Sequence, residues 1–200
     1  MYMNKTEPVE IDDYRLELEN RIRNLLWTVS GDYKLDMKPD VSLFLRSKAI
    51  ALYDGIKQGA LARYYDKDML GLYLVKKVFL QAGENELTFV AQLCIEEAIG
   101  DKICAERPGI RDMQRQCIED ILDQEFEKMP NLRDIPGRLK LAALRRRLHG
   151  GDYHVDRKLQ PYMDLIERAG KSQDTMELIR VIDELYNLLI DPMFETIHGS

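Results

Sequence analysis

Apolar residues recur at three- and four-residue spacing along almost the whole chain, and this periodicity is the strongest constraint on its fold. Glycine and proline, 12 and 7 in 200 residues, fall mainly at the joints between periodic stretches. No stretch shows the alternation of β-branched and polar residues that is typical of strands. We therefore predict an all-α fold, a single multi-helix bundle of about eight helices without a sheet.

The limits of these helices follow from capping residues and from breaks. Asp40, Asp66 and either Ser172 or Asp174 precede periodic stretches and are expected to cap helices. The break at Pro108-Gly109 should separate two helices, because proline disfavours helix in the residue before it. No linker is long enough to separate two domains, so we expect one α-helical domain over residues 1–200. The other expected helices cover residues 11–29, 85–106, 112–129, 136–149 and 155–169.

The charge balance narrows the classes of partner. The chain has 29 Lys and Arg against 35 Asp and Glu, a net charge of -6, so no global field attracts it to nucleic acid or anionic lipid. No apolar run approaches the ~18–20 residues that span a bilayer. Residues 1–10 lack the basic-then-apolar layout of a signal peptide. We expect a cytoplasmic protein that binds neither membranes nor nucleic acid.

Motifs of catalysis and cofactor binding are missing from the sequence. It has no glycine-rich phosphate loop, no His-Glu-x-x-His and no nucleophile elbow. The three histidines have no ligand partner at helical spacing, and the three cysteines match no zinc or redox spacing. We therefore predict no catalytic, cofactor or metal residue, and we expect the cysteines to pack as small hydrophobic residues. The three histidines are His149, His154 and His198, and the three cysteines are Cys94, Cys104 and Cys117.

Glu97 and Asp101 form the most informative pair of charges. They lie four residues apart and share a helix face with apolar residues such as Leu93 and Cys94, so both carboxylates are expected to point into the core. Buried carboxylates need a counter-charge, which could be an arginine from another helix, a bound cation or a shared proton. An internal ion pair with arginine is the commonest of these arrangements. Glu96 should face solvent.

A basic segment precedes the glycine pair at residues 150 and 151. The segment has six basic residues and one acid, Asp134. We interpret its basic residues as a candidate docking surface for a protein partner. The alternative is a solvated helix face whose long side chains cover the core. Arg146 is expected to point outward, with its two neighbours beside the apolar stripe. The six bases are Arg133, Arg138, Lys140, Arg145, Arg146 and Arg147.

The stretch 50–65 resembles the helix-turn-helix of TetR-type repressors. Gly55 would be the turn glycine, followed by Gly59 and the aromatic pair Tyr64-Tyr65. This resemblance implies an alternative function, a transcriptional regulator that binds DNA. The first 70 residues carry no surplus of Lys and Arg for phosphate contacts, which counts against it.

A second resemblance covers nearly the whole chain. Residues 16–33, 44–48 and 53–59 are similar to the N-terminal helical region of bacterial von Willebrand factor A (VWA) proteins of the nitric-oxide-reductase-activation and cobaltochelatase type. That class has a helix with Glu-Asp-Ala-Arg-(Ile/Val)-Glu followed by Pro-Gly. The sequence matches its acidic and alanine positions at Glu96, Glu97, Ala98 and Asp101, and its later pair at Pro108-Gly109, with Ile99 at the position of the arginine.

This resemblance implies an accessory role without catalysis. Proteins of this type resemble partners of MoxR-type AAA+ ATPases in metal insertion or maturation of enzyme complexes. Their VWA domain would bind Mg²⁺ through Asp-x-Ser-x-Ser, which residues 40–44 do not complete. We therefore expect a helical interaction module from which the VWA domain itself is absent.

Overall fold

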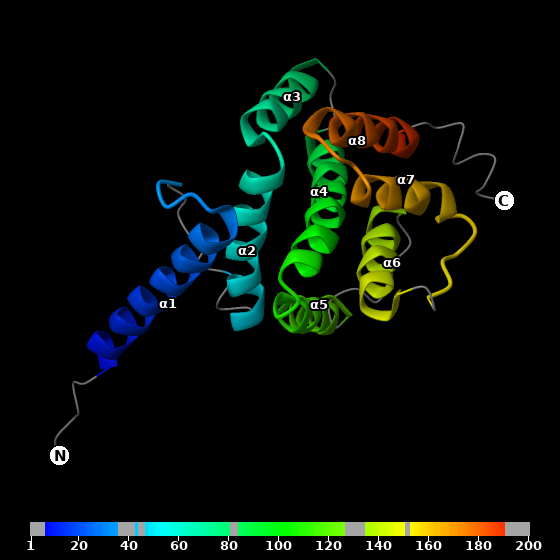
Figure 1. Ribbon diagram of the computed structural model, residues 1–200. Coiled ribbons are helices and arrows are strands. Elements are labelled where there is room, and N and C mark those ends of the chain that lie inside the picture. Colours follow the sequence, from blue (N-terminus) through cyan, green and yellow to red (C-terminus); the bar gives the residue numbers. More distant parts are fainter. Residues whose placement is uncertain are drawn as a thin grey trace.

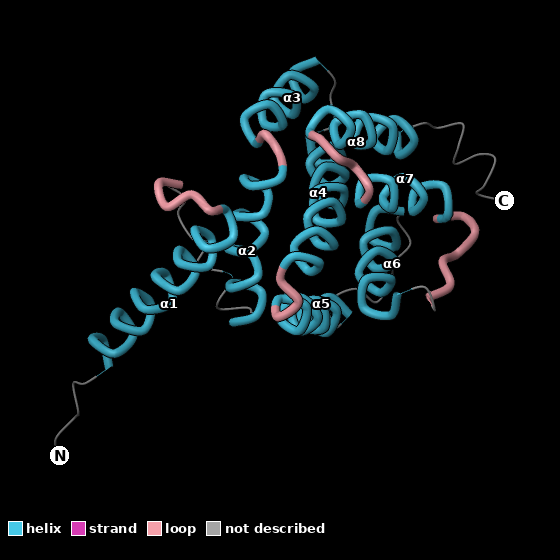
Figure 2. The backbone as a smooth tube through the Cα atoms, in the orientation of Figure 1, coloured by secondary structure: helices cyan, strands magenta, loops and turns pink. Residues whose placement is uncertain are grey.

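The computed structural model describes residues 7–35, 43, 47–80, 84–126, 135–150 and 153–190, and these contain eight helices and no strand (Figures 1 and 2). The prediction of an all-α fold is confirmed. The helices are α1 (Glu7–Ser30), α2 (Lys48–Tyr64), α3 (Lys67–Leu80), α4 (Glu84–Glu106), α5 (Ile110–Phe126), α6 (Ile135–His149), α7 (Gln160–Gly170) and α8 (Thr175–Ile190).

Helix α4 is the centre of the bundle. Its apolar side chains are buried all around the helix axis, among them Val90, Cys94, Ile99 and Ile103. α7 and α8 pack on one side of it and α2 on the other, as Figure 1 shows. The large core cluster continues into α8, where Leu178, Ile182 and Leu185 are fully buried. A helix that is apolar on every face needs such cover from several neighbours.

Helix α1 packs along α2 and extends away from the rest of the bundle (Figure 1). Two glycines of α2 make this close contact possible. A Cβ atom at Gly55 would lie 2.7 Å from Cγ2 of Ile22, and one at Gly59 would lie 2.6 Å from the backbone oxygen of Leu26. These glycines therefore serve helix packing, because only a residue without Cβ fits there.

The structure does not show the turn that the alternative, TetR-like resemblance implies at Gly55. α2 runs without a break from Lys48 to Tyr64, and the supposed turn residue Gly55 is buried in the middle of it. From the sequence alone, Gly55 is compatible both with a turn and with a close contact between two helices. The structure shows the close contact, because Gly55 packs against α1 within a continuous helix.

Most helix limits agree with the capping signals. Asp66 Oδ1 accepts the N–H groups of Asp68 and Met69 at 3.0 and 2.9 Å, as expected, and Asp174 rather than Ser172 caps α8. The second helix was placed wrongly: it begins after Ser47, whose Oγ accepts the N–H of Ala49, while Asp40 lies outside the described residues. α7 starts at Gln160 rather than at residue 155.

The three cysteines are buried free thiols, which confirms their prediction as small hydrophobic residues. Burial raises the pKa of the Cys117 thiol to about 12. None of the helices in the described ranges combines the length and the hydropathy that a bilayer-spanning segment needs.

Candidate functional site

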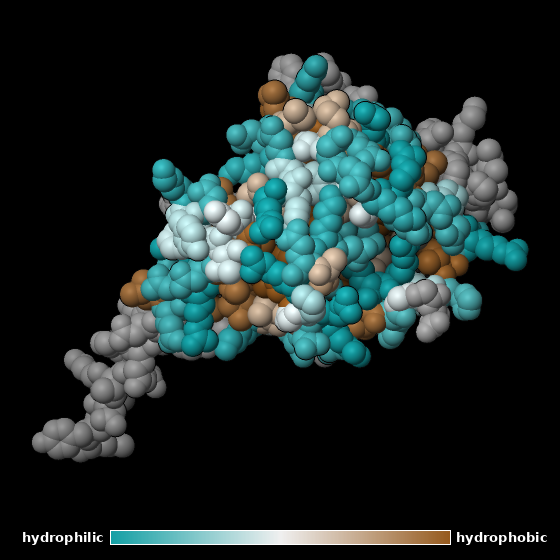
Figure 3. All heavy atoms as spheres, viewed as in Figure 1, coloured by the Kyte–Doolittle hydropathy of each residue, from teal (hydrophilic) through white to brown (hydrophobic). Residues whose placement is uncertain are grey.

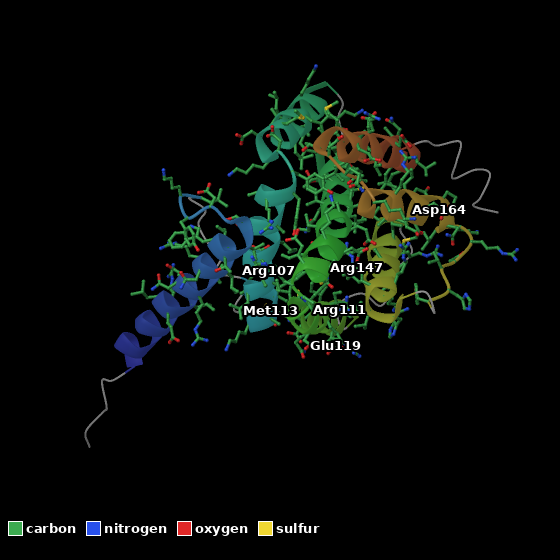
Figure 4. All side chains as sticks on the ribbon, in the orientation of Figure 1. Arg107, Arg111, Met113, Glu119, Arg147 and Asp164 are labelled. Carbon is green, nitrogen blue, oxygen red and sulfur yellow. The ribbon has the colours of Figure 1, made fainter. Side chains whose placement is uncertain are left out.

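Glu97 is buried near the middle of the bundle, as predicted. It is 8% exposed, and Gly170 at the end of α7 packs so closely that a Cβ there would lie 3.2 Å from Cγ of Glu97. Arg147 of α6 donates a hydrogen bond from Nε to its Oε2 at 2.7 Å. Figure 4 shows Arg147 between α4 and α6. Of the three counter-charges considered for Glu97, the structure shows the arginine.

Glu96 is not solvated, contrary to expectation. Its side chain is half-buried between α2 and α6, where Lys57 Nζ lies 3.0 Å from Oε1 and Arg147 Nη1 lies 3.6 Å from Oε2. The apolar pattern of α4 identifies the helix face of Glu96, but it does not show that α2 covers that face. Arg147 thus joins two adjacent carboxylates.

These contacts belong to a row of seven charges of alternating sign, which we call the charge ladder. It crosses four helices, with neighbouring charges 2.7–3.8 Å apart. Buried charges are tolerated when each one has a partner of opposite sign, and the ladder supplies that partner at every step. In order, its members are Asp54, Lys57, Glu96, Arg147, Glu97, Arg146 and Glu167.

The ladder favours the charged forms of Glu96 and Lys57. Burial opposes the charge of Glu96, but Lys57 and Arg147 outweigh it and hold the pKa of this carboxyl below its ordinary value. Burial likewise opposes the charge of Lys57, yet the neighbouring carboxylates of Glu96 and Asp54 raise the pKa of Lys57. Opposite charges therefore dominate over desolvation in this part of the molecule.

Asp101 is exposed, so its prediction as a buried member of the acidic node is wrong. It lies one turn after Glu97 and about 40° around the helix, beyond the part of α4 that the end of α7 covers. It forms no ion pair with any residue in the described ranges. Its carboxylate instead lines a cleft.

This cleft lies between α4, α6, α7 and the loop before α7, and we call it the α4–α6–α7 cleft. Its volume is about 590 Å³. Both acids of the predicted node and two of the six predicted docking residues line it, although the sequence analysis treated them as separate features. Its charged lining and the one histidine beside it are Glu97, Asp101, Arg146, Arg147, His154 and Glu167.

The predicted docking residues do not form a free basic surface. Arg146 does not point outward as expected, because it lies 3.8 Å from Glu97 and 3.5 Å from Glu167. Arg147 is 12% exposed, and Arg138 forms an ion pair with Asp156. Lys140 and Arg145 are half-buried, and Arg133 lies outside the described residues. Their role in docking stays a prediction.

A second polar cluster was missed by the sequence analysis. Lys102 Nζ donates to the hydroxyl of Tyr65 and to the backbone oxygen of Ser172, each at 2.7 Å. The hydroxyls of Tyr65 and Ser172 lie 3.0 Å apart, and Ser172 is fully buried. The cluster joins the α2–α3 junction to α4 and to the turn before α8. Its residues come from three distant segments, so no local pattern indicates it.

The side chains that could bind a metal do not cluster in the part of the chain that the structure describes. No group of three or more His, Cys, Asp and Glu side chains there could hold an ion. His149 and His154 are both exposed on either side of the glycine turn, and His198 lies outside the described ranges. What the α4–α6–α7 cleft offers chemically is a set of charges of both signs.

Comparisons of the chain with models of protein families, with curated proteins and with solved structures find no match.

Proposed function

We propose that this chain is a non-catalytic helical interaction module that binds a protein partner in the α4–α6–α7 cleft. The partner that the VWA resemblance favours is a MoxR-type AAA+ ATPase. In this role the module presents its ATPase to a client enzyme complex that needs metal insertion or maturation. The observation that carries the proposal is the meeting of the acidic end of α4 and the basic end of α6 at one cleft.

The charges inside the cleft support binding rather than catalysis. Arg147 and Glu97 neutralise each other at 2.7 Å, and Arg146 is held between Glu97 and Glu167. A general acid or base needs access to substrate, whereas Glu97 and Arg147 are paired with each other and nearly enclosed. The cleft therefore has the charged, internally paired walls that suit a recognition site.

Asp101 is a carboxylate in the cleft that is available to a partner. Its carboxylate is exposed and makes no ion pair within the described ranges, while the arginines beside it are already paired. A lysine or arginine of the partner that enters the cleft would meet this carboxylate first. Charges at the rim of an interface chiefly set the association rate and the choice of partner.

The test is the affinity of the purified chain for a purified MoxR-type AAA+ ATPase, measured by biolayer interferometry with the ATPase held in its ATP-bound form. We expect binding by the wild-type chain. Asp101→Lys should weaken it by about tenfold or more, because it places a positive charge where a positive group of the partner docks. The side chain is exposed, so this variant should keep its circular dichroism spectrum and melting temperature.

Asp112→Lys is the matched control. Asp112 is another exposed acid in the first turn of α5, and it does not line the cleft. This variant should bind like the wild type. Equal affinities for the wild type, Asp101→Lys and Asp112→Lys would contradict the cleft as the docking site, and a lack of binding by the wild type would contradict the partner.

A further inference from the structure

Helix α3 exposes a row of large apolar side chains. Leu72 and Val75 are 70% and 69% exposed and Met69 is 40% exposed, on the side of the helix that faces away from the bundle. Figure 3 shows hydrophobic atoms over α3 at the top of the molecule. A contiguous exposed patch of this kind marks a contact surface.

Gly71 lies in the same exposed part of α3. A Cβ atom built there would meet nothing within 4 Å, so packing within the chain gives no reason for a glycine. A glycine inside a helix costs roughly 0.5–1 kcal/mol relative to alanine. The close approach of another helix is a reason to keep it, as Gly55 and Gly59 illustrate where α1 packs on α2.

The charges beside the apolar row are arranged symmetrically about Leu72. Asp68 lies four residues before it and Lys76 four residues after it, and both are exposed without an ion pair in the described part of the chain. Met69 and Val75 lie three residues before and after it. An antiparallel copy of α3 centred on Leu72 would therefore bring Asp68 level with Lys76 of the second copy, and Met69 level with Val75. A parallel copy would place Asp68 beside Asp68, which is unfavourable.

We propose that the exposed face of α3 is a homodimer interface, in which two copies of the chain pair their α3 helices antiparallel about a two-fold axis at Leu72. Such an interface is isologous, since the same residues contribute from both copies. α3 has 14 residues and a length of about 21 Å. Two helices of this size cover an area near or below the ~1,200 Å² at the lower end of stable interfaces, so the dimer is weak and concentration-dependent.

Charge exchange between two variants tests this pairing. Asp68→Lys makes both flanking charges of α3 positive, and Lys76→Asp makes both negative. Sedimentation velocity from micromolar to near-millimolar concentration should show the wild type moving from 23.3 kDa toward twice that mass. Each variant alone should remain monomeric. An equimolar mixture of the two should dimerise again, and so should the double variant, because both restore two opposite-charge pairs.

Arg180→Asp, a charge reversal at an exposed position of α8, is the control and should dimerise like the wild type. A wild type that stays monomeric throughout overturns the proposal, and so does a dimer that Asp68→Lys leaves unchanged. A mixture of the two charge variants that stays monomeric also overturns it. This interface is separate from the α4–α6–α7 cleft, so Asp101→Lys should not alter dimerisation, and a failure here leaves the proposed function untouched.

Discussion

Glu97 and Arg147 depend on each other because both are nearly closed off from water. Their side chains are 9% and 12% exposed, and the hydrogen bond between them is 2.7 Å long. Nη2 of Arg147 is also buried and has no hydrogen-bond partner within the described residues. Removal of either partner would therefore leave a charge in the interior with too few contacts to compensate its lost hydration.

Glu97→Ala should accordingly lower the free energy of unfolding by about 3 kcal/mol, because Arg147 keeps its buried charge and loses its closest carboxylate. Chemical denaturation followed by circular dichroism measures this change. Asp101→Ala is the control, since Asp101 is exposed one turn away and should change stability by less than about 0.5 kcal/mol. Similar stabilities for the two variants would contradict the buried ion pair.

Glu96 makes the stability depend on pH. The pKa of this carboxyl is lower in the folded chain than its ordinary value of 4.5, chiefly because Lys57 and Arg147 outweigh the effect of burial. Its stabilisation is present above the ordinary value and is lost as the pH falls through the folded one. The wild type should therefore lose more stability than Glu96→Gln when the pH is lowered from about 5 to 3. Parallel losses in the two proteins would be evidence against this interpretation.

At the scale of helices, two glycines inside helices have opposite surroundings. A Cβ at Gly59 would lie 2.6 Å from a backbone oxygen of α1, whereas a Cβ at Gly71 would meet nothing. Gly59→Ala should therefore destabilise the chain by roughly 1–3 kcal/mol, because α1 has to move. Gly71→Ala should stabilise the monomer by roughly 0.5–1 kcal/mol through helix propensity. Denaturation at low protein concentration compares the two, and a Gly59→Ala variant as stable as the wild type would contradict the packing described for α1 and α2.

The sequence predicts the helices well where a cap or a break is local. Asp66 was predicted as a cap, and Asp174 was one of two candidates for the last helix; both side chains bond to N–H groups two or three residues ahead. Ser47 was missed because several polar residues precede the same helix, and the choice between them depends on tertiary contacts such as the hydrogen bond of Ser47 to Asp120. Gly55 was misread because close packing on α1 involves residues far away in the sequence.

The candidate site was predictable only in part. The apolar pattern of α4 correctly places Glu97 on a buried face. The same pattern predicts burial for Asp101, which is exposed, because the pattern does not show how far the neighbouring helices cover α4. The partners of Glu97 and Glu96 lie 50 and 39 residues away along the chain. Only the arrangement of α2, α4 and α6 in space shows that Lys57 and Arg147 join these acids into one ladder.

At the scale of the whole molecule, the charge ladder ties α2, α4, α6 and α7 together and ends at the α4–α6–α7 cleft. These ion pairs connect the three helices that build the cleft. A cleft that needs little rearrangement when a partner binds favours affinity. We propose that the chain acts through this cleft, rather than through the early helices or a catalytic centre.

Hydrogen–deuterium exchange of the chain with and without the MoxR-type ATPase tests this claim most directly. The proposed docking predicts slower exchange on binding at the end of α4, at the end of α6 and in residues 153–160, with α1 unchanged. Slower exchange in α1 and α2 alone, or equal exchange throughout despite binding, would contradict it.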